Sequence, residues 1–132
     1  LPNHLDDCVL DTLGGVSLLS SLGCSSIGLV GHSFGGAVVI GAGSLSAHVK
    51  TVISLSSQTA GATAAGKLSP RPLLLIHGAE DEQLPPECSE LIYDWAQEPK
   101  HLIIIPGTGH GLKECRETLF VLVKDWLTEN LL

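Results

Sequence analysis

The chain has 132 residues, of which 44% are hydrophobic and 16% are charged, a composition that predicts a folded globular protein and excludes a disordered one. A chain of this length can bury one sizeable core, so we expect a single domain over residues 1–132. The formal net charge is −7 and only seven residues are Lys or Arg. Because phosphate binding needs clustered cations, nucleic acid is not expected as a partner.

The sequence also argues against a membrane span and a metal centre. No apolar run reaches the ~18 residues that a transmembrane helix requires, so we expect no membrane association and a cytoplasmic location. The cysteines are widely spaced, without a C-x-x-C pair or a histidine at metal-ligand spacing; they are Cys8, Cys24, Cys88 and Cys115. We expect buried free thiols and no metal.

Apolar periodicity predicts three elements in the first third of the chain. Asn3 is the predicted N-cap of a helix over residues 4–22, which Gly23 ends. A short apolar strand follows at 26–30. Directly after it, residues 34–47 are rich in Gly, Ala and Val and are predicted to form a helix.

Three further apolar runs, at 51–55, 72–77 and 102–105, are too short for buried helices and indicate buried strands. Helices are predicted between and after them, at 85–97 and 112–131. Continuous apolar strands that alternate with helices imply a mostly parallel sheet of about four strands, covered by helices on both faces. The predicted fold class is therefore α/β.

Two segments carry more specific expectations. The segment 56–70 is small and polar and is predicted to be a loop, whose Ser and Thr side chains could line a pocket at the ligand-binding edge of an open α/β sheet. On the last helix, the side chains expected to face inward are Leu112, Cys115, Leu119, Phe120, Val123, Trp126, Leu127 and Leu131.

A candidate nucleophile lies between the first strand and the second helix. Gly31-His32-Ser33-Phe34-Gly35 fits the pattern G-x-S-x-G in its strand-to-helix context. At such a turn the serine is strained, and Gly31 and Gly35 are expected because a Cβ at either position would strike the neighbouring strand or helix. The Phe34 N–H, at the helix start, is the predicted oxyanion donor. Close packing alone also explains a glycine-rich turn.

A serine hydroxyl needs a base, and the base needs an acceptor that fixes its tautomer. Asp81 follows the strand at 72–77, and His110 follows the strand at 102–105. Because the carboxyl ends of parallel strands open on one edge of a sheet, Ser33, Asp81 and His110 are expected to converge. Taken singly, His110 as a helix cap and Asp81 as a turn residue are equally good interpretations.

The neighbouring titratable residues receive lesser roles. His77, four residues before Asp81, could hydrogen-bond loop backbone there and so support Asp81 without contacting the substrate. Glu80 and Glu82 are alternative acids, and His32 is expected to point away from the site. Surface positions are predicted for the remaining histidines, which are His4, His48 and His101.

Three motifs together resemble the α/β-hydrolase superfamily. Gly-His-Ser-Phe-Gly-Gly at 31–36 looks like its nucleophile elbow, His-Gly-Ala-Glu-Asp at 77–81 like its acid loop, and Gly-Thr-Gly-His-Gly at 107–111 like its histidine loop. The style is similar to small esterases and dienelactone-hydrolase-like members. The resemblance implies a serine hydrolase that cleaves a small carboxylic ester or thioester through an acyl-enzyme, without metal or organic cofactor.

The resemblance covers only the C-terminal half of the family fold. The absent half would supply a second oxyanion N–H, and its absence turns the strand at 26–30 into an exposed apolar edge. Two copies pairing through this edge as a homodimer, or a natural protein that contains the absent half, would cover it. The alternative function is a non-catalytic association module with a remnant triad, and acyl transfer to an acceptor other than water uses the same residues.

Overall fold

Strands and helices alternate along residues 4–132, the part of the chain that the computed structural model describes. The predicted N-cap Asn3 lies outside the described residues. The elements are α1 (His4–Ser21), β1 (Ile27–His32), α2 (Phe34–Leu45), β2 (Val49–Leu55), the 3-10 helix η1 (Thr63–Lys67), β3 (Leu73–Gly78), α3 (Glu87–Trp95), β4 (Lys100–Ile105), the 3-10 helix η2 (Lys113–Cys115) and α4 (Arg116–Leu131). Each helix and strand predicted from the sequence forms, with small shifts at its ends.

The strands form one parallel sheet in the order β1-β2-β3-β4. The register pairs Val30 with Ile53 and Ile76 with Ile103. Because all four strands run in the same direction, their carboxyl ends lie at one edge of the sheet. This arrangement confirms the predicted α/β class and its parallel sheet.

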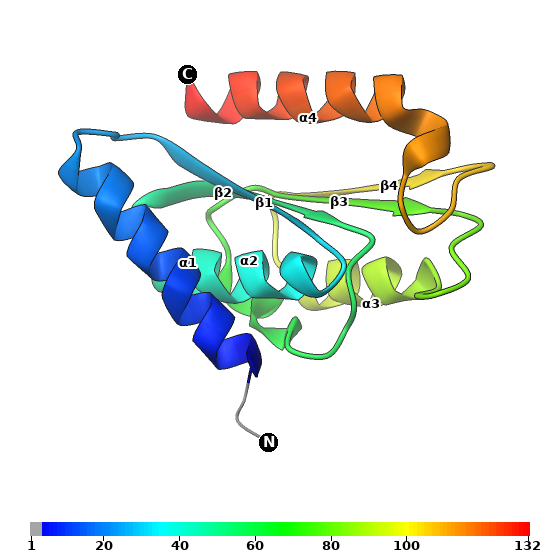
Figure 1. Ribbon diagram of the computed structural model, residues 1–132, viewed down its shortest axis with the longest axis horizontal. Coiled ribbons are helices and arrows are strands. Elements are labelled where there is room, and N and C mark those ends of the chain that lie inside the picture. The colour runs from blue at the N-terminus through cyan, green and yellow to red at the C-terminus, as the bar shows by residue number, and fades with distance from the viewer. Residues whose placement is uncertain (1–3) are drawn as a thin grey trace.

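Helices cover both faces of the sheet, with α4 on one face and α1, α2 and α3 on the other (Figure 1). Ile53 and Ile76 are buried on the α4 face, whereas Val52 and Leu75 belong to the core on the opposite face. Side chains along each strand thus alternate between two cores, which is why these strands are apolar throughout. Within residues 4–132, none of the helices is both long enough and apolar enough to cross a membrane.

The segment 56–70, predicted to be a loop, contains η1. Ala62, Ala65 and Leu68 are buried there and join the core beneath α2 and α3. The sequence of this segment contains mostly small residues and no apolar stripe, so it shows no helical periodicity. The helix packs through close approach of its backbone to the core and not through large side chains.

The inward stripe of α4 differs from the predicted one at two residues, because it includes Leu122, which was not predicted, and excludes Phe120, which was. Phe120, expected to face inward, is 68% exposed. The side chains of α4 that pack against the sheet are Leu119, Leu122, Val123, Trp126 and Leu127, which recur at helical spacing. Phe120 lies on the flank of this stripe, about 100° around the helix from Leu119. Leu112 is buried, but it precedes the helix in a left-handed conformation with φ 58°.

The cysteines are free, as predicted, but they differ in burial. Cys115 is buried and Cys8 and Cys88 are partly buried, whereas Cys24 is exposed. The prediction of buried thiols is therefore wrong for Cys24, because this residue lies in the exposed turn between α1 and β1.

Helix α2 packs closely on the sheet through small residues. A Cβ added to Gly43 would lie 2.5 Å from Val52 Cγ2 and 3.2 Å from Leu68 Cδ2. By contrast, a Cβ added to Gly14 in α1 would meet no described atom within 4 Å. Glycine at position 43 is thus required by packing, and glycine at position 14 is not.

These two helical glycines form a matched pair for a stability test. We expect Gly43→Ala to lower the free energy of unfolding by about 1–3 kcal/mol, because the neighbouring side chains must shift. Gly14→Ala should raise it by about 0.5–1 kcal/mol, because alanine favours the helix. Urea unfolding monitored by circular dichroism measures both, and a loss of stability in both variants would contradict the packing argument.

Strand β1 lies at the edge of the described sheet, where it pairs with β2 alone among residues 4–132. Val30 on this strand is 44% exposed. Pairing of two copies through β1 stays a prediction, whose physical reason is the row of free backbone groups at an apolar edge. Analytical ultracentrifugation should give twice the 13.8 kDa of one chain, and a single-chain mass at micromolar concentration would contradict it.

Candidate active site

Ser33 lies at the sharp turn between β1 and α2, in a backbone conformation that serine rarely adopts. Its φ is 61° and its ψ is −117°, and its N–H donates a hydrogen bond to the carbonyl of Leu55 at the end of β2, at 2.8 Å. Its side chain makes no capping hydrogen bond to α2. The hydroxyl is therefore presented at the carboxyl edge of the sheet, as the elbow pattern predicts.

The glycines around this turn have different roles. A Cβ at Gly31 would collide with the backbone carbonyl of Gly35, and a Cβ at Gly36 would lie 2.6 Å from Ser54 Oγ. A Cβ at Gly35 would meet no described atom within 4 Å. The predicted steric reason thus holds for Gly31 and fails for Gly35, because the backbone of Gly35, and not its Cα substituent, makes the close approach.

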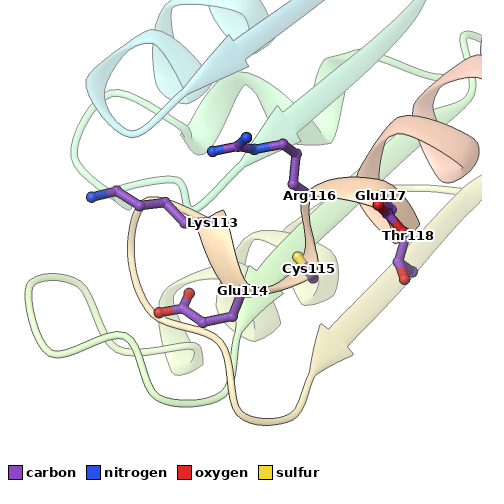
Figure 2. A pocket seen from close by; sticks show the side chains of 6 residues that line it. All are labelled: Lys113, Glu114, Cys115, Arg116, Glu117 and Thr118. Carbon is purple, nitrogen blue, oxygen red and sulfur yellow. The ribbon is translucent and has the colours of Figure 1, made fainter.

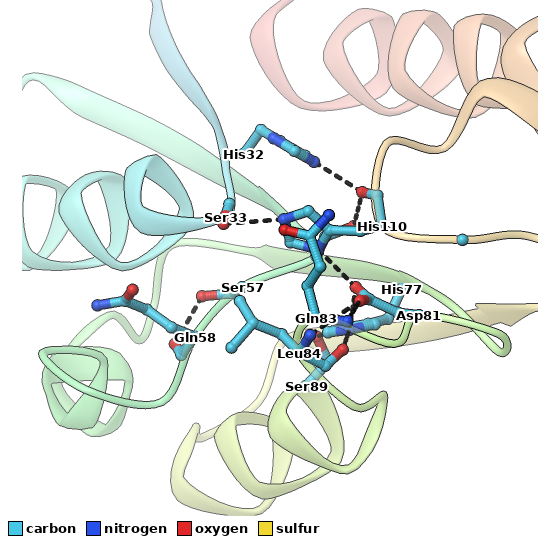
Figure 3. A network of polar contacts seen from close by, with 12 residues as sticks. His32, Ser33, Ser57, Gln58, His77, Asp81, Gln83, Leu84, Ser89 and His110 are labelled. Carbon is cyan, nitrogen blue, oxygen red and sulfur yellow. Dashed lines mark hydrogen bonds and ion pairs between the residues drawn. The ribbon is translucent and has the colours of Figure 1, made fainter.

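The structure brings Ser33, Asp81 and His110 together, as the sequence predicts (Figure 3). His110 Nδ1 lies 2.7 Å from Asp81 Oδ2, and His110 Nε2 lies 3.1 Å from Ser33 Oγ. A carboxylate only accepts, so Nδ1 carries the proton and Nε2 is left to accept the hydroxyl of Ser33. The three side chains form one chain of hydrogen bonds that can remove a proton from the serine.

Asp81 is buried yet ionised. Burial raises the pKa of this carboxyl, but hydrogen bonds from the Leu84 N–H, His110 and the Gln83 N–H outweigh burial and hold the pKa below its ordinary value. The two N–H groups reach Oδ1 at 2.8 and 2.9 Å. Since Oδ1 is occupied by backbone, Oδ2 is fixed toward His110 and carries negative charge beside it.

The backbone carbonyl of His110 accepts two hydrogen bonds that sequence reasoning missed. His32 Nε2 lies 2.8 Å from this oxygen and Ser56 Oγ lies 3.0 Å from it. The rings of His32 and His110 are also in contact, with centroids 4.9 Å apart. The prediction that His32 points away is therefore wrong, because its ring turns across the sheet edge toward the histidine loop. Ser56 had one available signal, its position directly after a strand at this edge.

The other candidate residues lie apart from this chain of hydrogen bonds. Glu80 and Glu82 are exposed, so Asp81 is the carboxylate that meets His110. Cys88, at the start of α3, is kept as a thiol because burial, followed by the charges of Asp81 and Glu87, raises its pKa. Such a thiol is a poor nucleophile.

Phe34 is the first residue of α2. The first N–H groups of a helix have no partner within the helix, and the helix dipole adds positive potential there. The Phe34 N–H, next to Ser33, stays the predicted donor to an oxyanion formed on a carbonyl attacked by Ser33.

A shallow hollow of about 360 Å³ lies beside the histidine loop and is lined by residues 113–118 (Figure 2). Ser33, Asp81 and His110 are not among its lining residues. Within residues 4–132, no three His, Cys, Asp or Glu side chains gather in a way that would hold a metal ion.

No protein-family model matches the chain. Solved structures do match it. Est1E of Butyrivibrio proteoclasticus with ferulic acid bound has a TM-score of 0.83 at 20% identity, over 92% of this chain and 67% of that chain. Dienelactone hydrolase of Anabaena variabilis has a TM-score of 0.82 at 23% identity, over 92% of this chain and 58% of that chain. The alpha/beta hydrolase GrgF of Penicillium has a TM-score of 0.82 at 15% identity, over 93% of this chain and 71% of that chain. The chain has the α/β-hydrolase fold.

The chain matches only part of the length of the curated relatives. The uncharacterized protein YfhR of Escherichia coli is 54% identical over 43 residues, which are 33% of this chain and 15% of YfhR. An uncharacterized protein of Mycobacterium tuberculosis is 34% identical over 61 residues, which are 45% of this chain and 22% of that protein. The chain therefore spans less than two thirds of the length of these curated relatives and of dienelactone hydrolase.

The lowered pKa of Asp81 predicts how stability depends on pH. A carboxyl whose pKa is lower in the folded chain stabilises fully above its ordinary value of 3.8, and this contribution is lost as the pH falls through the folded pKa. The difference in unfolding free energy between the wild-type chain and Asp81→Asn should therefore shrink as the pH falls below 3.8.

Urea unfolding at a series of pH values measures this difference. The matched control is Glu82→Gln, which neutralises an exposed carboxylate one residue away. A difference between wild type and Asp81→Asn that stays constant down the whole series would contradict the assignment of Asp81 as a hydrogen-bonded anion.

Proposed function

We propose that this chain is a serine hydrolase that cleaves a carboxylic ester or thioester. The observation that carries the proposal is the continuous hydrogen-bonded chain from Ser33 Oγ through His110 to Asp81 Oδ2, built on a strained serine at a strand-to-helix turn. This combination couples a nucleophile to a base whose tautomer is fixed. A hydrogen bond with a purely structural role would require neither the fixed tautomer nor the strained serine.

Catalysis begins at Ser33. The hydroxyl oxygen attacks the acyl carbon while its proton passes to His110 Nε2, 3.1 Å away. The carbonyl oxygen becomes an oxyanion, which the Phe34 N–H stabilises. Asp81 stabilises the imidazolium electrostatically and stays ionised.

The second half of the reaction releases the acyl group. His110 gives its proton to the leaving alcohol or thiol, and the bond from the acyl carbon to the leaving group breaks to form the acyl-enzyme. Water then loses a proton to His110 and attacks the acyl carbon, after which the carboxylic acid leaves and Ser33 recovers its proton. Each proton is moved by His110 alone, so no metal or organic cofactor enters the scheme.

The solved neighbours support ester chemistry. They include Est1E, solved with ferulic acid bound, an esterase domain from Rhodothermus marinus and an esterase of Pyrococcus furiosus. At 20%, 20% and 17% identity they share the fold with this chain, and the fold alone hosts many activities. The hydrogen-bonded chain at Ser33 is what extends their chemistry to this protein. Acyl transfer to an acceptor other than water would use the same residues.

A second candidate function is favoured by one observation, the edge strand β1. Among residues 4–132 this strand pairs on one side only, and an apolar strand edge is a natural site for association. In that case the chain would be an association module in which the hydrogen-bonded chain at Ser33 is a remnant.

Intact-mass labelling with a fluorophosphonate separates the two functions. We expect one adduct on the folded wild-type chain, because only a serine activated by a base reacts with this probe, and no adduct on Ser33→Ala. Hydrolysis of p-nitrophenyl acetate should fall by at least about 10³-fold in the same variant.

Ser44→Ala is the matched control. Ser44 lies in α2, the helix that follows Ser33, and its hydroxyl donates to the carbonyl of Gly41 in the same helix, so this variant should label like the wild type. A heat-unfolded sample should not label. A folded wild-type chain that gives no adduct would instead support the association module.

A further inference from the structure

His77 is a second histidine beside Asp81, and it makes three polar contacts. It is the penultimate residue of β3 and has no exposed surface. Its Nε2 lies 2.8 Å from the carbonyl oxygen of Leu84 and 3.1 Å from Asp81 Oδ2. Its Nδ1 lies 2.7 Å from the hydroxyl of Ser89, which is itself fully buried at the start of α3 (Figure 3).

These contacts fix the tautomer of His77. A carbonyl and a carboxylate both accept hydrogen bonds, so Nε2 must carry a proton and donate it to them. Nδ1 is then free to accept the hydroxyl hydrogen of Ser89. Both ring nitrogens then have hydrogen-bond partners, which is what a fully buried imidazole requires.

Asp81 Oδ2 consequently receives two N–H groups. One comes from His110 at 2.7 Å and the other from His77 at 3.1 Å, while Oδ1 receives the N–H groups of Gln83 and Leu84. Leu84 closes the loop, because its N–H bonds Asp81 and its carbonyl accepts from His77. The carboxylate is held from both ends and cannot rotate without breaking bonds to β3 and to its own loop.

We propose that His77, fixed in its Nε2–H tautomer by Ser89, is a positioning residue that orients Asp81 and sets how strongly Oδ2 attracts the proton of His110. This inference rests on the proposed serine hydrolase function. Because His77 shares Oδ2 with His110, it draws part of the negative charge of that oxygen away from the base.

Two effects of removing His77 follow. The loss of an anchor lets Asp81 and His110 move from their aligned positions, and small misplacements of reacting groups lower rates steeply. At the same time, the charge on Oδ2 acts on His110 alone and favours its protonated form, so the base stays protonated to a higher pH. A merely structural histidine would produce neither a directional change in pH dependence nor rescue by a side chain that keeps only the donor.

The test is the second-order rate constant of fluorophosphonate labelling at Ser33, measured between about pH 5 and pH 8, where histidine bases titrate. For His77→Leu we expect the rate constant to fall by about 10–100-fold at the pH optimum. We also expect the acidic limb of its pH profile to move to higher pH. His77→Gln, whose amide N–H can replace Nε2–H, should restore most of the rate and the position of the limb.

The controls address folding and the other titratable groups. His101→Leu removes a histidine from the neighbouring strand β4, where its ring faces Trp126 and not the site, and should leave rate and profile unchanged. Among the described residues, the titratable groups that other elements place near Asp81 and the histidine loop include His32 on β1, Cys88 on α3 and Glu114 in η2, and all are kept in every variant. Circular dichroism verifies that each variant is folded.

The outcomes separate this inference from the proposed function. No labelling of the wild-type chain overturns the hydrolase itself. Labelling of the wild type together with an unchanged rate and profile in folded His77→Leu overturns the positioning role. If His77→Leu does not fold, His77→Gln decides, because a folded Gln variant with a large loss of rate and no shift of the limb is the result of a purely structural histidine.

Discussion

Parallel pairing of the four strands is the constraint on which the candidate site depends. It brings the ends of β1, β3 and β4 to one edge, so that residues 33, 81 and 110 meet although the chain separates them widely. Strand β2, which lies between β1 and β3, contributes backbone hydrogen bonds. The carbonyl of Leu55 accepts the N–H of Ser33, and the carbonyl of Ile76 accepts the N–H of Ser56, so the pairing of the sheet continues into the site. A slip of one residue in this register would exchange the two buried faces of a strand and shift the turn that follows it away from the other turns of the site.

The width of the sheet explains why a histidine joins the other two residues. Strands β1 and β3 are separated by β2, and two strand spacings amount to about 10 Å, too far for a direct contact between Ser33 and Asp81. The loop after β4 crosses back over this gap, and the two ring nitrogens of His110 bridge it. Ser56, directly after β2, and His32, at the end of β1, both hydrogen-bond the carbonyl of His110, which ties the crossing loop to these two strands.

The sequence contains two kinds of information, and only one of them is readable without coordinates. Apolar runs are periodic, so the strands and the four long helices were predictable, and position after a strand was enough to nominate Ser33, Asp81 and His110. Contacts between a side chain and a distant backbone atom follow no period. The bonds of His32 and Ser56 to the carbonyl of His110 and the open space at Gly35 belong to this second kind. Phe120 shows the same limit for packing, because an apolar residue on the flank of a helix stripe looks like a member of it.

Backbone strain is concentrated where the candidate site lies. Among residues 4–132, the non-glycine residues with positive φ are Ser33, Ser56 and Leu112, at 61°, 48° and 58°. Ser33 is the candidate nucleophile, Ser56 supports the carbonyl of His110, and Leu112 follows two residues after His110. Conformations of this kind cost about 1–3 kcal/mol each unless glycine adopts them, so a fold under selection for stability alone would favour glycine at all three positions. Each is instead locked by a backbone hydrogen bond from its own N–H, to Leu55, Ile76 and Gly109. These three fixed backbone positions surround His110 and restrict its motion. A base that moves little needs little reorganisation when the proton is transferred.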